Sequence, residues 1–237
     1  MSPESYPVDQ IREVKKNCLE LLLKIAALCP VDASGHRPEA FRLIATPMLY
    51  AVWERCFTLC QSISLRMIRD ECKHTRALTS VQRALWLQCQ PFYQRFLDQI
   101  RTSTAPAFAK RVKRGPFNAL SEFMGNFDEW MNREIDNAIN TDDLVISFSN
   151  VNPDVVRLNA AVIGIEEHHG FKKLDFGRLH DLVGRRNEIG HGGIVNIPGN
   201  REFSELWVFT ENLVTHYCDS FSDWILSRPS NVESESI

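Results

Sequence analysis

The sequence lacks several features that would point directly to a class of protein. Its formal net charge is only −3, so no overall electrostatic field attracts nucleic acid or a membrane surface, and any such contact needs a local patch. The apolar run at residues 19–29 is interrupted by Lys24 and is too short to span a bilayer. Residues 1–16 lack the apolar core of a signal peptide. We therefore expect a soluble, cytoplasmic protein with no membrane partner.

The sequence also lacks a convincing set of metal ligands. Its seven cysteines are odd in number and most lie in apolar helical stretches, which favours free thiols in a reducing compartment. Cys56 and Cys60 share a helix face, and Cys72 lies close to His74. A zinc site needs two good ligand pairs, however, and the second pair is missing. We expect no metal and no cofactor.

Strand patterns are nearly absent as well. Alternation of apolar and polar residues does not persist beyond 144–148, which we interpret as a connector, and there is no internal repeat. Helical periodicity predicts helices over 9–28, 38–70, 80–100, 120–139, 153–163, 174–189 and 202–226, with a loop at 101–118. Pro47 should kink or divide the second helix, and Pro91 should bend the third. With 44% hydrophobic residues to form a core, the fold class is all-α, a bundle of about seven helices.

Cationic, proton-transferring and helix-breaking residues converge at one place, the segment from Leu179 to Gly193. The guanidinium of Arg186 could grip a phosphate with its planar fork of donors, and the imidazole of His191 could accept or donate a proton. Together these groups suffice to cleave a phosphodiester without a metal. On a straight helix the two side chains would lie about 140° apart, so they converge only if the helix ends first. The glycines at 190, 192 and 193 favour such an end.

A simpler interpretation competes with this one. Basic side chains at the end of a helix stabilise the negative end of its dipole, and Arg185 could pair with Asp181 or Glu188. On that interpretation the segment is only a well-terminated helix.

The same segment resembles the active-site motif of HEPN-domain ribonucleases, in which an arginine and a polar residue are followed, after three variable positions, by a histidine. Arg186, Asn187 and His191 fill this pattern, with Gly192 as the trailing glycine. Residues 48–54, and residues 149–154 leading to 163–165, are similar to segments of the toxin-like HEPN branch. Two positions depart from the family pattern. Glycine replaces the usual alanine at 190, and glycine replaces the tyrosine at 193 that is found in the branch paired with nucleotidyltransferase antitoxins.

The resemblance implies a metal-independent endoribonuclease in which two motif helices of a homodimer form one cleft. His191 would transfer protons, Arg186 would hold the scissile phosphate, and Asn187 would orient one of them. The products would be a 2′,3′-cyclic phosphate and a 5′-hydroxyl. By family habit the enzyme would act as a toxin or defence effector, with an antitoxin or regulatory protein as partner. A non-catalytic HEPN dimer that binds RNA, a nucleotide or a protein, and a purely structural scaffold, remain alternatives.

The resemblance also predicts the domain organisation. Residues 1–228 would form a single HEPN-like domain, in which 71–148 have no counterpart in the minimal domain and would be inserted or accessory helices. Residues 229–237 would be a disordered polar tail.

A basic stretch at 101–114 could follow an RNA backbone, because no acidic residue lies between Asp98 and Glu122. A solvated surface loop is the alternative. The candidate RNA-binding residues are Lys110, Arg111, Lys113 and Arg114, together with Arg185 of the motif.

Overall fold

The fold is all-α. A computed structural model describes residues 6–28, 31–32, 35–102, 114–147, 150–190 and 196–228. These residues form α1 (Pro7–Ala27), α2 (Glu39–Cys72), α3 (Ser80–Gln88), α4 (Pro91–Thr102), α5 (Arg114–Met131), α6 (Pro153–Ile163), α7 (His169–Lys172), α8 (Leu179–Gly190) and α9 (Asn200–Ser227), with 3-10 turns η1 (Thr75–Ala77) and η2 (Thr141–Leu144). They contain no strand, only one isolated bridge between His74 and Glu134. None of the described helices is both long enough and apolar enough to cross a membrane.

The chain divides into two compact units, residues 1–65 with 145–237, and residues 66–144. The second unit nearly coincides with the segment expected to be accessory helices. That both units belong to one domain stays a prediction, and the predicted tail at 229–237 lies outside the described residues.

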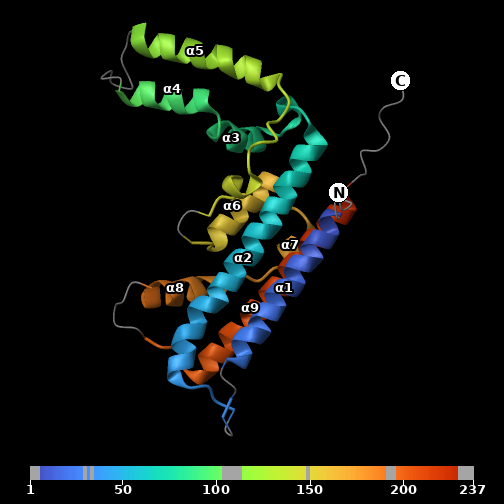
Figure 1. Ribbon diagram of the computed structural model, residues 1–237, viewed down its shortest axis with the longest axis vertical. Coiled ribbons are helices and arrows are strands. Elements are labelled where there is room, and N and C mark those ends of the chain that lie inside the picture. The colour runs from blue at the N-terminus through green and yellow to red at the C-terminus, as the bar shows by residue number, and fades with distance from the viewer. Residues whose placement is uncertain are drawn as a thin grey trace. The chain divides into compact units, whose positions relative to one another are not determined.

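The first unit is built around a long apolar contact between its terminal helices. Figure 1 shows α1 and α9 running side by side, and these two helices form the most extensive contact between described elements. The middle of α2 packs on α9, where the buried ring of Trp53 meets that of Tyr217 edge-on at 5.0 Å between centroids. Gln61 on α2 donates to the Tyr217 hydroxyl at 2.9 Å. The helix predicted over 202–226 is therefore confirmed, and its apolar face forms part of the core.

The second unit is a helical hairpin with an aromatic core. α4 and α5 lie against each other (Figure 1), and Phe96 stacks on Phe123 at 4.7 Å between centroids. The helix predicted to reach residue 139 ends at Met131, so that prediction is wrong. The helix ends early because of a contact between residues far apart in the sequence. The backbone N–H of Ile135 donates to the carbonyl of Lys73 at 2.8 Å, so residue 135 cannot continue the helix, although its side chain is buried.

Prolines and polar turns account for the remaining differences. α2 continues through Pro47 without being divided. At Pro91 a bend within one helix was expected, but the structure has two helices, α3 and α4, because proline suits the first position of a new helix. The motif helix begins at Leu179, not at 174, since the Asp175 carboxylate accepts from the Gly177 N–H at 2.7 Å and forms a turn first. α5 begins at Arg114, inside the stretch predicted as a loop, of which 103–113 lie outside the described residues.

The connector at 144–148 is not a strand in its described part, 144–147. The side chain of Asn159 takes the place of a neighbouring strand: it accepts from the Ile146 N–H at 3.1 Å and donates to the Ile146 carbonyl. The helix that follows, α6, has the predicted bounds. Asn152 caps it by accepting from the N–H groups of Asp154 and Val155 at 3.1 and 3.0 Å.

Candidate functional site

The candidate site begins with one face of α8. Leu179, Leu182 and Val183 are buried and anchor this helix in the first unit. Arg186 follows one turn after Leu182 on the same side, so its half-buried side chain is carried toward the protein interior and not into open solvent. A charged group in this position needs polar or aromatic surroundings to offset its lost hydration.

Arg186 finds such surroundings on two other segments of the first unit. Its guanidinium carbon lies 5.2 Å from the centre of the Tyr50 ring on α2, within cation–π distance. Its Nη1 donates to the side-chain oxygens of Asn187 at 3.0 Å and Asn150 at 3.4 Å. In the part of the chain that the structure describes, no carboxylate forms an ion pair with this guanidinium, and only Nη1 has a hydrogen-bond partner. The side chain is held in place, and no described residue compensates its positive charge.

Tyr50 is itself fixed by hydrogen bonds. Its buried hydroxyl accepts from the Val151 N–H at 2.8 Å and donates to Glu54 Oε1 at 3.3 Å. Burial raises the pKa of Tyr50 above its ordinary value, and the Glu54 charge adds to this, while the bond from Val151 and the charge of Arg186 oppose it. Tyr50 therefore stays neutral near pH 7, so Arg186 interacts with its aromatic ring and not with a phenolate.

The loop that carries Asn150 is attached to the same turn of α2. Besides the Tyr50 bond, the indole N–H of Trp53 donates to the Val151 carbonyl at 3.3 Å. Both backbone polar groups of Val151 are thus satisfied by aromatic side chains of α2, which fixes where Asn150 meets Arg186. The described parts of the three sequence segments, 48–54, 150–154 and 179–190, therefore come together at Arg186.

Of the predicted catalytic residues, Arg186 and Asn187 are in contact, and His191 lies outside the described residues. The described part of α8 reaches Gly190, and the expected helix end before His191 stays a prediction, because residues 191–195 lie outside the described residues. Sequence reasoning did not assign roles to Tyr50 or Asn150. The sequence did contain one indication of this contact. Tyr50 and Glu54 are one helical turn apart in the segment at 48–54, which is similar to a segment of the toxin-like HEPN branch.

Arg185 has a different environment from its neighbour. Its Nε and Nη2 both donate to Glu202 Oε1 on α9, at 2.9 and 2.7 Å, and its Nη1 donates to Glu188 and to the Asn196 carbonyl. All three of its nitrogens are engaged, and the side chain ties α8 to α9. An RNA contact by Arg185 stays a prediction, and it would require these bonds to open.

The predicted basic stretch is only partly visible. Lys110, Arg111 and Lys113 lie outside the described residues, and Arg114 is described only as the first residue of α5. The structure therefore adds nothing to their predicted role.

A pocket of about 560 Å³ lies elsewhere in the first unit, between α7 and α9. Its lining includes three carboxylates, Asp175, Asp219 and Asp223, against one lysine, Lys173, and it does not include Arg186 or Tyr50. Carboxylates repel an anionic ligand, so this pocket suits a phosphate group less well than the exposed side of Arg186.

The all-α fold, with an arginine near the end of α8 that has no carboxylate partner among the described residues, is consistent with the resemblance of the motif to HEPN proteins. A family model described as RiboL-PSP-HEPN matches residues 12–225, and the chain belongs to this family. The HEPN assignment made from the motif is thereby confirmed. No curated protein and no solved structure gave a match.

Proposed function

We propose that the protein is a metal-independent endoribonuclease that cleaves RNA through the ribose 2′-hydroxyl. The observation that carries this proposal is the state of Arg186. It is a half-buried guanidinium, positioned by Tyr50 and Asn150, that keeps donors and charge available among the described residues. A group held in this way can bind a phosphodiester and stabilise the extra negative charge that develops on it during cleavage. Membership of a HEPN family, whose superfamily includes ribonucleases and RNA-binding proteins, supports the same conclusion.

Each residue of the motif has a separate task in this proposal. Arg186 holds the scissile phosphate, and Asn187, whose amide oxygen accepts from Arg186, orients the guanidinium. His191 comes directly after the last residue of α8 and transfers protons, taking one from the 2′-hydroxyl or giving one to the leaving 5′-oxygen. The products are a 2′,3′-cyclic phosphate and a 5′-hydroxyl. DNA has no internal nucleophile and should survive.

The decisive experiment uses matched RNA and DNA oligonucleotides with the purified full-length protein and excess EDTA. We expect RNA to be cut, DNA to remain intact, and a single 2′-deoxy substitution at the cleaved position to abolish cutting there. His191→Ala and Arg186→Ala should abolish cleavage, whereas Arg157→Ala, an exposed arginine on α6, should not. Binding of RNA without cleavage would favour the alternative of a non-catalytic HEPN protein. Cleavage that requires a metal would contradict the mechanism.

We further propose that two copies of the chain form one composite cleft. If so, neither single variant is active, but a mixture of Arg186→Ala and His191→Ala chains contains heterodimers with one intact guanidinium and one intact imidazole facing each other. Partial recovery of cleavage on mixing is expected. No recovery from chains shown to exchange subunits would contradict a shared cleft.

The biological role proposed is that of a toxin or defence effector controlled by a partner protein. Wild-type expression should then arrest growth, and Arg186→Ala should relieve that arrest. If cells that produce the active enzyme grow normally, this role is contradicted, but the proposed RNA cleavage is not.

A further inference from the structure

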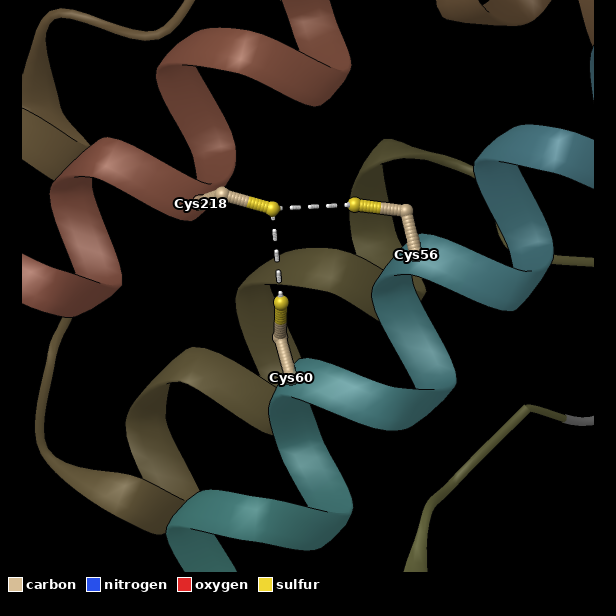
Figure 2. A group of neighbouring side chains, drawn as sticks. All are labelled: Cys56, Cys60 and Cys218. Carbon is tan, nitrogen blue, oxygen red and sulfur yellow. Dashed lines mark hydrogen bonds between the residues drawn. The ribbon is translucent and has the colours of Figure 1, made fainter. Parts of the chain in front are cut away.

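Four cysteines from three helices meet in the interior of the first unit. Cys56 and Cys60 lie on α2, Cys218 on α9 and Cys18 on α1, and all four are buried. Figure 2 shows the Cys218 thiol pointing between the other two: its sulfur lies 3.5 Å from that of Cys56 and 3.8 Å from that of Cys60. The three sulfurs of Figure 2 all lie within 4.8 Å of one another.

The fourth cysteine is adjacent to this group. The Cys18 thiol points to the Val52 carbonyl oxygen at 3.9 Å, one helical turn before Cys56 on α2, but its sulfur is not one of the set that lies within 4.8 Å of one another. The sulfurs therefore come from three helices that pack on one another, not from one loop.

The separations suit a tetrahedral ion. A zinc–sulfur bond of about 2.3 Å places two thiolate ligands about 3.8 Å apart in a regular tetrahedron. The sulfur contacts of Cys218 match this edge length, so an ion could enter with little movement of the helices. Soft thiolates without carboxylates select zinc over calcium or magnesium.

We propose that Cys56, Cys60 and Cys218 bind one Zn²⁺ ion in a structural site, and that a turn of the buried Cys18 side chain toward them supplies the fourth ligand, so that the ion joins α1, α2 and α9. Burial of all four ligands leaves no open position for substrate, which is the property of a structural and not a catalytic zinc site. Because the site is closed, the ion binds as the chain folds.

This site was hidden in the sequence for a simple reason. Cys56 and Cys60 form one recognisable pair, but the second pair consists of single cysteines on α1 and α9, with no local spacing to identify them. Only the packing of the terminal helices on α2 brings the two pairs together.

The test is the metal content of the full-length chain, grown in zinc-supplemented medium and purified under reducing conditions without chelating resin. Elemental analysis should find about one zinc ion per chain, and Cys89→Ser, which alters an exposed cysteine of the second unit, should leave that content unchanged. Cys218→Ser should lose most of the zinc.

A second measurement avoids dependence on variants that fail to fold. Replacing zinc by Co²⁺ in the wild-type chain should give thiolate-to-cobalt charge-transfer bands and the visible spectrum of a tetrahedral ion, and chelation should lower the melting temperature by several degrees. Metal-free protein that binds no Co²⁺ would overturn the proposal. So would copper in place of zinc, or a disulfide between Cys56 and Cys218 in freshly prepared chain. None of these results depends on ribonuclease activity.

Discussion

The guanidinium carbon of Arg186 lies 5.2 Å from the centre of the Tyr50 ring, so the cation at the end of α8 rests against a buried, neutral aromatic side chain. Its neighbour Arg185 has the opposite environment, with a carboxylate of α9 bound to two of its nitrogens. Two consecutive arginines thus have different physical tasks. Arg185 connects α8 to α9, and Arg186 presents a positive charge.

Replacing Arg186 with lysine should reduce RNA cleavage by roughly 100-fold or more while leaving the fold intact. Lysine keeps the positive charge but loses the planar fork that binds two phosphate oxygens together. Cleavage rates at saturating RNA, with circular dichroism to verify folding, provide the measurement. Arg157→Lys is the matched control, because that arginine lies on the surface of α6 in an exposed ion pair. Full activity of the Arg186 variant would mean that charge alone is sufficient.

Replacing Tyr50 with phenylalanine should lower the free energy of unfolding by about 1–3 kcal/mol, because the buried N–H of Val151 loses its acceptor. The ring remains, so the contact with Arg186 remains too. Denaturant unfolding checks the stability, and the cleavage rate should change less than in the Arg186 variant. Tyr93→Phe, a half-buried tyrosine of the second unit, is the control. A variant as stable as the wild type would show that the hydroxyl does not anchor the loop.

The bond between Arg185 and Glu202 should give a coupling energy of about 1 kcal/mol in a double-mutant cycle with alanine at each position. The value is modest because the Glu202 side chain is 39% exposed and is screened by solvent. If Arg185 acts only within the protein, the salt dependence of RNA binding should be the same in Arg185→Ala as in the wild type. A shallower dependence would instead support the predicted RNA contact.

The predictions from the sequence were most accurate for features that neighbouring residues determine, such as the ends of short helices. α6 has the predicted bounds because Asn152 and Pro153 define its start within a few residues. The end of α5 was misplaced because Ile135 continues the apolar pattern although its backbone bonds to Lys73, far away in the sequence. The same limitation applies to the site. Arg186 and Asn187 could be recognised from a motif, but the contacts of Arg186 with Tyr50 and Asn150 are long-range and became visible only when the segments packed together.

The basic stretch at 101–114 is expected to contribute to RNA binding and not to the cleavage chemistry. Changing Lys110, Arg111, Lys113 and Arg114 together to glutamine should weaken RNA binding and reduce its dependence on salt, because each lost phosphate contact removes roughly 0.7 from the slope of log K against log salt for a single strand. Binding titrations at several salt concentrations provide the measurement, made with the His191→Ala chain so that the RNA is not degraded. Glutamine at Arg12 and Lys16, two exposed basic residues of α1, is the control for a general loss of charge. A slope equal to that of the unsubstituted chain would show that the stretch is a solvated loop and that the RNA is held elsewhere.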